Sequence, residues 1–209
     1  MSNISKPETD GWIGKRQDNT FENYQRDEYN KAIHYCERKR TAIDLGGNVG
    51  MMAYRMCKDF DEVHSFEPLF AKHIKENTKE FSNIDVYPLA VGDKKDKVTM
   101  RKGIYHSGGS NIVKEKNASQ QSYIDNIDVV TVDSYNFKNV DFIKIDVEYY
   151  ELQAITGAYK TIKKYKPTLL VELHANNDGR KKILNILVDD LKYVPEQAGE
   201  LDWIFRKWI

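Results

Sequence analysis

The segment AIDLGGNVGMMAYRM, residues 42–56, constrains the fold more than any other part of the sequence. A short, mostly apolar run at 41–45 leads directly into Gly46 and Gly47, and a helix is expected to begin at about Val49. Glycines allow a sharp turn with positive φ, and they let a ligand approach the main chain where a Cβ would collide. The following helix presents free N–H groups and its positive dipole end to the same loop. The segment therefore predicts a ligand-binding turn after a buried strand.

Strand-like and helix-like segments alternate along the rest of the chain. Strand candidates occur at 41–45, 62–66, 84–90, 141–147, 168–174 and 202–207. Segments with helical character occur at about 21–40, 49–58, 70–81, 150–164 and 178–190. This alternation is typical of βαβ crossovers, so we expect an α/β fold with a doubly wound, mostly parallel sheet and helices on both faces. Two short runs, 97–100 and 128–132, are expected to add antiparallel pieces.

The length of 209 residues is that of one domain with a substantial core. Residues 1–20 are polar and interrupted by glycines, and we interpret them as an N-terminal arm. Residues 21–209 are then a single domain. Within it, residues 102–126 are polar, contain two adjacent glycines and have little periodicity. A loop of this length is usually functional or disordered, so we expect a lid or substrate-facing insertion, or else a disordered segment.

Composition and charge exclude several classes of protein. Apolar residues make up 40% of the chain and charged residues 31%, which is a globular composition. No run approaches the ~20 apolar residues of a spanning helix, and the N-terminus lacks a signal-peptide core, so we expect a cytoplasmic protein without a membrane partner. Thirty-two basic and 32 acidic residues cancel, which disfavours binding of long nucleic acid by bulk charge, although a small basic patch would suffice for a nucleic acid end. Cys36 and Cys57 define neither a metal set nor a disulfide framework.

A second acidic residue indicates a nucleoside site. Glu67 lies 23 positions after Asp44, at the tip of the next expected strand, where nucleotide-binding sheets place a carboxylate that accepts hydrogen bonds from ribose. A dinucleotide site expects the pattern G-x-G-x-x-G, with a pyrophosphate on the helix N-terminus. Here the loop begins with an acid, which suits the ammonium of an amino-acid portion better than a pyrophosphate. The two carboxylates describe a ligand without phosphates, and S-adenosylmethionine is that ligand.

An ordered set of motifs resembles the FkbM-type methyltransferases, which are class I enzymes dependent on S-adenosylmethionine. The matching segments are AIDLGGNVG (42–50), SFEP (65–68), LAVGD (89–93), VTVDSY (130–135), DFIKIDVEYYELQAITGA (141–158) and LLVELH (169–174). The resemblance covers about residues 40–206. Where the family usually has a glycine after IDVE, this chain has Tyr149, followed by Tyr150.

The resemblance implies a seven-stranded sheet whose last strand is antiparallel and whose ligands lie beyond the carboxyl ends of the parallel strands. It also implies transfer of a methyl group to acceptors that are mostly hydroxyls. The residues expected to bind the cofactor are Asp44, Gly46, Gly47, Asn48, Gly50, Glu67, Pro68, Ala90, Val91 and Asp146. Ala90 and Val91 end the third strand, where they would contact the adenine.

Four ionisable residues fall at the ends of two expected strands, and we predict that they are catalytic: Asp146, Glu148, Glu172 and His174. Members of each pair are two positions apart, so they leave the strand on the same side, and all four converge if the strands are neighbours. Methyl transfer is an in-line displacement that needs mainly alignment and, for a hydroxyl acceptor, removal of a proton. We expect His174 or Glu172 to be the base, with Glu148 an alternative if nearby charge raises its pKa, and Asp146 to orient the cofactor or acceptor. The expected reaction is O-methylation of a small molecule or sugar.

Several alternatives stay open. Asp146 could cap the next helix instead, and the carboxylates with His174 could hold Mg²⁺ or Mn²⁺, although nothing here resembles a closed metal-ligand motif. A nicotinamide-dependent oxidoreductase shares the sheet and the ribose acid, and a non-catalytic nucleoside-binding module would keep the same pocket. Trp12, Tyr24 and Arg26 could fold over the cofactor or contact the acceptor, because aromatic side chains are costly to expose in a polar arm.

Overall fold

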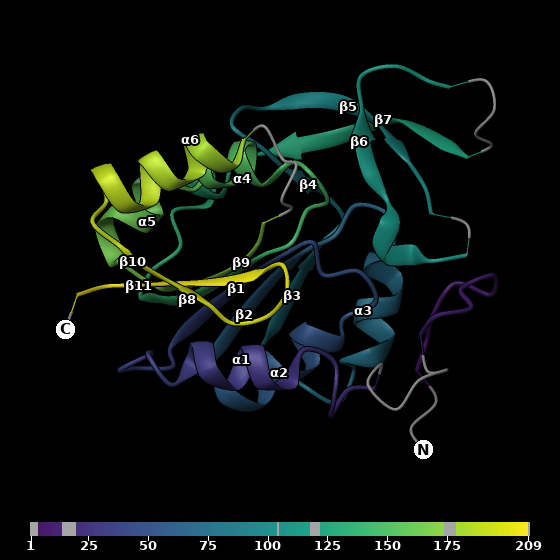
Figure 1. Ribbon diagram of the computed structural model, residues 1–209. Helices are drawn as coiled ribbons and strands as arrows, with labels where there is room; N and C mark the ends of the chain where they lie inside the picture. Colours follow the sequence, from purple (N-terminus) through teal and green to yellow (C-terminus); the bar gives the residue numbers. More distant parts are fainter. Residues whose placement is uncertain (1–3, 14–19, 104, 118–121, 174–178, 209) are drawn as a thin grey trace.

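A seven-stranded sheet forms the centre of the molecule (Figure 1). The computed structural model describes residues 4–13, 20–103, 105–117, 122–173 and 179–208. The strand order of the sheet is β10-β11-β9-β8-β1-β2-β3. The strands are β1 (Thr41–Leu45), β2 (Glu62–Phe66), β3 (Ile84–Tyr87), β8 (Val140–Ile145), β9 (Thr168–Glu172), β10 (Val194–Gln197) and β11 (Asp202–Arg206). The strands β3, β2, β1, β8 and β9 are parallel, whereas β11 is antiparallel to β9 and to β10. The expected doubly wound sheet with an antiparallel last strand is therefore confirmed.

Helices cover both faces of this sheet (Figure 1). They are α1 (Arg26–Ile33), α2 (Met51–Asp59), α3 (Ala71–Asn77), α4 (Glu151–Gly157), α5 (Tyr159–Tyr165) and α6 (Arg180–Leu184), which continues into a π-helical segment, Asn185–Asp190. The helices α4, α5 and α6 lie on one face, and α1 and α2 lie on the other. In the ranges that the structure describes, no helix has the length and apolar character of a bilayer-spanning segment.

Strand alternation explains the two cores. Ile43 and Ile143 face α4, α5 and α6, whereas Ala42, Phe142 and Leu170 face α1 and α2. All five side chains are almost fully buried. Strands that are apolar on both faces must be covered on both faces, which is why the runs in the sequence read as continuous rather than alternating.

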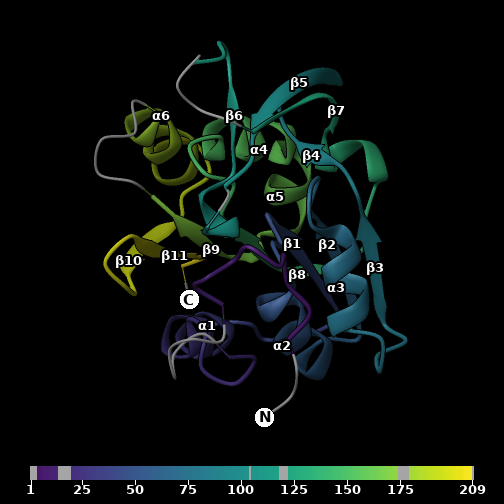
Figure 2. The same cartoon turned by 90° about the vertical axis from the view of Figure 1, so that its right-hand side faces the viewer.

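A second, four-stranded sheet has the order β4-β7-β5-β6. Its strands are β4 (Ala90–Val91), β5 (Asp96–Arg101), β6 (Asn111–Val113) and β7 (Tyr123–Val130). The predicted antiparallel pieces are found in β5 and β7, where Lys97 pairs with Asp128. Figure 2, like Figure 1, shows this sheet on the same side of the main sheet as α4. The polar segment 102–126 contributes β6, the first residues of β7 and a short 3-10 turn, Ser107–Gly109.

Two expected helices differ in extent. The helix predicted over 21–40 is wrong in length, because α1 is confined to Arg26–Ile33. Phe21 instead stacks on Tyr54 of α2, so its apolar character reflects a separate contact. The helix predicted over 150–164 is divided at Ala158, whose φ of −107° and ψ of 5° interrupt the helical geometry between α4 and α5. Beside this break, a Cβ at Gly157 would lie 1.8 Å from the Gly92 carbonyl oxygen, so the close approach requires glycine.

Candidate functional site

A row of polar side chains crosses the sheet at the carboxyl ends of its central strands. Ser65 on β2, Asp44 on β1 and Lys144 on β8 lie side by side in register. Two positions earlier, the same face carries Ala42 and Phe142, which belong to the core under α1 and α2. The polar residues therefore begin where the apolar core on this face ends.

Lys144 belongs to this group of residues, and the sequence prediction did not include it. It is only 4% exposed, and its ammonium lies 3.0 Å from an Asp146 carboxylate oxygen and 4.0 Å from one of Asp44. Burial alone would lower the pKa of Lys144, but the charges of Asp146 and Asp44 raise it above its usual value, so the ammonium stays charged. The signal in the sequence is a lysine at an inward-facing position of the otherwise apolar run FIKI.

Carboxyl groups surround this ammonium. Burial, and then the charge of Asp146, raises the pKa of Glu148 to about 8, that of Glu172 to about 10 and that of Asp202 to about 6. A hydrogen bond with Asp146 also favours the protonated form of Glu172. Asp202 joins the group because it pairs with Glu172 across the β9–β11 ladder. Raised pKa values of this kind in one place are typical of functional sites.

Asp146 does not cap a helix. Its backbone N–H donates to the Leu45 carbonyl, and α4 begins only at Glu151, with Tyr150 at the N-cap position. The alternative that Asp146 is a capping residue is therefore wrong, because the chain makes a further turn between β8 and α4. Within that turn, Glu148 and Tyr149 have φ values of 48° and 72°, in the left-handed region that favours glycine.

The glycine loop after β1 is tightly packed against the end of β8. Gly46 has φ of +84°, and a Cβ there would lie 1.8 Å from the Asp146 carbonyl oxygen, so no other residue fits. Asn48 follows with φ of 49°, and Gly50 is the N-cap of α2. The predicted turn between the first strand and its helix is present in the structure.

Glu67 has a partly structural role. One of its carboxylate oxygens accepts a hydrogen bond from the Asn48 N–H at 2.9 Å, and the other accepts from the N–H groups of Leu69 and Phe70 at 2.8 and 3.1 Å. Burial raises its pKa to about 7, although these hydrogen bonds oppose the shift. Glu67 thus links the loop after β1 to the loop after β2, and it also lines the cavity described next.

A cavity of about 870 Å³ opens at this edge of the sheet. The predicted residues that line it are Gly46, Gly47, Asn48, Glu67, Pro68, Ala90, Val91, Asp146, Glu148 and Glu172. Trp12, Tyr24 and Arg26 line it as well. The predicted residues Asp44 and Gly50 are buried behind this lining, and His174 lies outside the described residues. The structure therefore brings most of the predicted positions together around one space.

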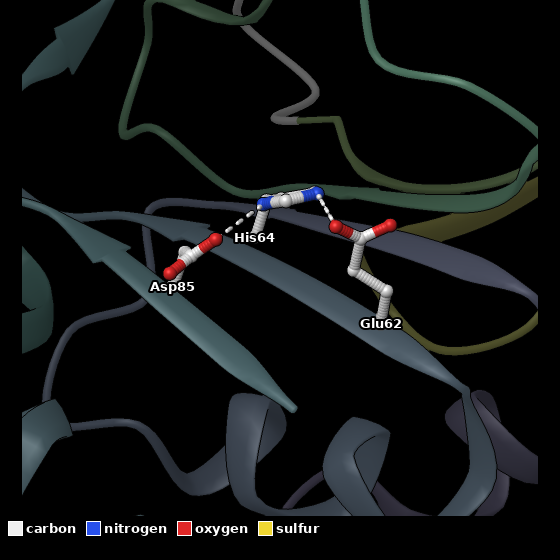
Figure 3. Close-up of side chains that lie close together, drawn as sticks. All are labelled: Glu62, His64 and Asp85. Carbon is white, nitrogen blue, oxygen red and sulfur yellow. Dashed lines mark ion pairs between the residues drawn. The ribbon is translucent and has the colours of Figure 1, made fainter. Parts of the chain in front are cut away.

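A separate group of metal-ligand atoms occurs at Glu62, His64 and Asp85 on β2 and β3 (Figure 3). His64 Nε2 is 3.2 Å from a Glu62 oxygen, and its Nδ1 is 3.7 Å from an Asp85 oxygen and 3.2 Å from the Tyr87 hydroxyl. Burial lowers the pKa of His64, which favours the neutral ring that links the two strands. Among the described residues, this group rather than the cavity brings potential metal ligands within 4.8 Å of one another.

The chain matches the family model described as "Methyltransferase FkbM domain" over residues 44–206. Comparison with curated proteins gave no match. Among solved structures, the chain is similar to methyltransferase FkbM from Methylobacillus flagellatus KT, with 20% identity and a TM-score of 0.54, covering 80% of this chain and 43% of that one. The chain thus spans less than half of the Methylobacillus protein.

Two further structures share the fold. An rRNA methylase from Streptococcus thermophilus has 8% identity and a TM-score of 0.52, with 87% of this chain and 94% of that chain covered. A methyltransferase from Streptococcus mutans, described as putative and solved in complex with S-adenosylhomocysteine (SAH), has 10% identity and a TM-score of 0.51, with 85% and 94% covered.

Proposed function

Because this chain belongs to the FkbM methyltransferase domain family and has S-adenosylmethionine as its cofactor, we propose that it methylates a hydroxyl group of a small molecule or sugar in the cavity at the sheet edge. The observation that carries the proposal is that the half-buried carboxyl group of Glu148 lines the cavity and has a pKa raised to about 8. A proton acceptor with a pKa near the working pH is what a hydroxyl acceptor requires.

The loop after β1 fits the cofactor. Asn48 lines the cavity, and its Oδ1 is buried without a hydrogen-bond partner among the described residues, so it can accept from a ligand ammonium. Gly46, Gly47 and Asn48 would hold the amino-acid portion and Glu67 the ribose, while Pro68, Ala90 and Val91 would line the adenine side. When bound, S-adenosylmethionine supplies an electrophilic methyl group on a sulfonium.

Glu148 is the preferred base among the three candidates. Glu172 shares a hydrogen bond with Asp146, and its pKa of about 10 lies further above neutral pH than the pKa of about 8 of Glu148. In the described part of the chain, no hydrogen bond engages the Glu148 carboxyl group, so it is available to an acceptor. Glu148 would take the hydroxyl proton onto a carboxylate oxygen, while the Lys144–Asp146 ion pair fixes the floor of the site. His174 remains a candidate that the same experiment tests.

The test combines binding and turnover. Calorimetry with S-adenosylmethionine and SAH measures cofactor binding, and methyl transfer is measured on a panel of hydroxylated small molecules and sugars. Glu148→Gln should lower kcat at least about tenfold with SAH binding unchanged. Glu200→Gln, which changes an exposed carboxyl group of the same cavity, is the matched control and should keep activity.

Three outcomes decide between the possibilities. If Glu148→Gln keeps full activity and His174→Ala loses most of its activity, His174 and not Glu148 is the base. Binding of SAH without turnover on any acceptor would indicate the non-catalytic module instead. Failure to bind SAH at millimolar concentration would contradict the proposed function itself.

A further inference from the structure

Asp10 is a buried carboxylate that joins two distant segments. It is 4% exposed, and its Oδ1 accepts hydrogen bonds from the backbone N–H groups of Trp12 at 2.8 Å and Ile13 at 3.0 Å. Its Oδ2 accepts from the backbone N–H of Ser107 at 2.8 Å, 97 positions along the chain. Hydrogen bonds to an ionised acceptor are stronger than neutral ones, so Asp10 is a firm link between the N-terminal segment and this turn.

Other contacts join the same two segments. The Gly11 N–H donates to the Tyr105 carbonyl at 3.0 Å. The Trp12 ring meets the His106 ring edge to face, with centroids 4.6 Å apart, and it meets Tyr24 in the same manner at 5.9 Å. Trp12, Tyr24 and His106 all line the cavity. The link at Asp10 therefore builds an aromatic wall of the site.

This wall lies close to the glycine loop. A Cβ built on Gly108 would be 3.7 Å from the Asn48 Nδ2 atom. At its other end, the N-terminal segment is fixed to α3, because the Ser5 N–H donates to the Asn77 side chain at 2.7 Å and Asn77 donates back to the Ser5 carbonyl at 2.8 Å. The segment thus crosses the site with an anchor at each end.

Asp10 and Trp12 lie outside the residues 44–206 that match the family. We propose that Asp10 is a positioning residue that holds Trp12 and the 105–110 turn as one wall of the cavity, and that this wall slows the departure of the bound nucleoside. The identity of that nucleoside, SAH, rests on the proposed function. Retention of the ligand is then set by a segment outside the family-matched region.

Two substitutions break the same hydrogen bond from opposite ends. Asp10→Asn leaves one acceptor oxygen, which cannot serve both the Trp12–Ile13 turn and Ser107. Ser107→Pro removes the N–H that reaches Asp10, and His106, with φ of −145° and ψ of 101°, has the extended conformation that precedes proline readily. Tyr105→Phe is the matched control, because Tyr105 is 77% exposed and the change keeps the backbone carbonyl that accepts from the Gly11 N–H.

The readouts are Trp12 exposure and the SAH dissociation rate. In a background carrying Trp203→Phe and Trp208→Phe, Trp12 is the remaining tryptophan, and acrylamide quenching reports its exposure. Asp10→Asn and Ser107→Pro should each raise quenching and speed SAH dissociation by about tenfold, the loss expected for one charge-assisted hydrogen bond. Tyr105→Phe should change neither. The double variant should be no worse than either single variant, because both remove one shared bond.

A merely structural role would lower the melting temperature without changing the dissociation rate of the folded fraction, and that result would overturn the proposal. Unchanged Trp12 shielding in both variants would overturn it as well. If Asp10→Asn fails to fold, Ser107→Pro decides. If the parent protein does not bind SAH, the proposed function fails, while the quenching experiment still decides whether Asp10 holds the wall.

Discussion

The Lys144 ammonium and the Asp146 carboxylate lie 3.0 Å apart at the centre of the sheet's carboxyl edge. Lys144 also lies 4.0 Å from Asp44, which is completely buried. A buried ammonium between two carboxylates occupies the place that a divalent cation would otherwise need. The fold therefore supplies its own positive charge to an acidic site, which is the physical argument against the metal alternative at this position.

Removal of this charge should destabilise the protein strongly. Lys144→Met leaves Asp44 and Asp146 without their buried partner, and we expect a loss of about 3–5 kcal/mol in the free energy of unfolding at neutral pH. Urea denaturation measures it. Lys97→Met is the control, because Lys97 pairs with Asp128 on the surface at 2.7 Å and its loss should cost at most about 1 kcal/mol. Equal losses in the two variants would show that the buried pair contributes no more than an exposed one.

Glu172 should make stability depend on pH. Its pKa of about 10 is above its ordinary value of 4.5, so the folded protein binds this proton more tightly than the unfolded chain. This contribution to stability is complete at low pH and is lost as the pH rises from 4.5 to about 10, with a slope of up to about 1.4 kcal/mol per pH unit. Glu172→Gln should flatten this slope and be more stable than the parent at alkaline pH. Denaturant unfolding at several pH values checks it, and parallel curves for the two proteins would contradict it.

Glu148 should control the pH dependence of turnover. With a pKa of about 8, its carboxyl group is protonated at neutral pH and must ionise before it accepts a proton. We expect kcat/KM to rise about tenfold per pH unit below that value and to level off above it. The rate of Glu148→Gln should be low and should lack this rise. A parent profile that is flat across neutral and mildly alkaline pH would argue against Glu148 as the base.

Tyr149 occupies a backbone conformation that suits glycine. Its φ is 72° and the residue is 56% exposed, so Tyr149→Gly relieves backbone strain at a largely exposed position. We expect the free energy of unfolding to stay the same or to rise by about 1 kcal/mol. Tyr150→Gly, at a half-buried position that lines the cavity, should be clearly destabilising. A loss for Tyr149→Gly as large as that for Tyr150→Gly would show that the Tyr149 side chain packs in a way that matters.

The local pattern of the chain predicts much of the architecture. The strand candidates at 41–45 and 62–66 are the strands β1 and β2 with the same bounds. The run at 41–45 is mostly apolar because β1 is buried along its whole length. The glycines after β1 also predict the turn correctly, because the structure leaves no room for a Cβ at Gly46. The acidic residues at the ends of β8 and β9 could be proposed as neighbours because parallel strands end at the same edge.

Other features depend on contacts between residues far apart in sequence. The hydrophobic periodicity of the sequence shows neither the break between α4 and α5 nor the short extent of α1. The sequence around Lys144 indicates only a charged residue within a strand. The sequence by itself determines the alternation of side chains along a strand, and this alternation gives only the face of the strand on which a residue lies. The register of β1, β8 and β9 decides which charged side chains lie close together, and the path of the N-terminal segment decides what covers them. The tertiary structure alone fixes both, because backbone hydrogen bonds and packing between residues far apart in the sequence make these pairings.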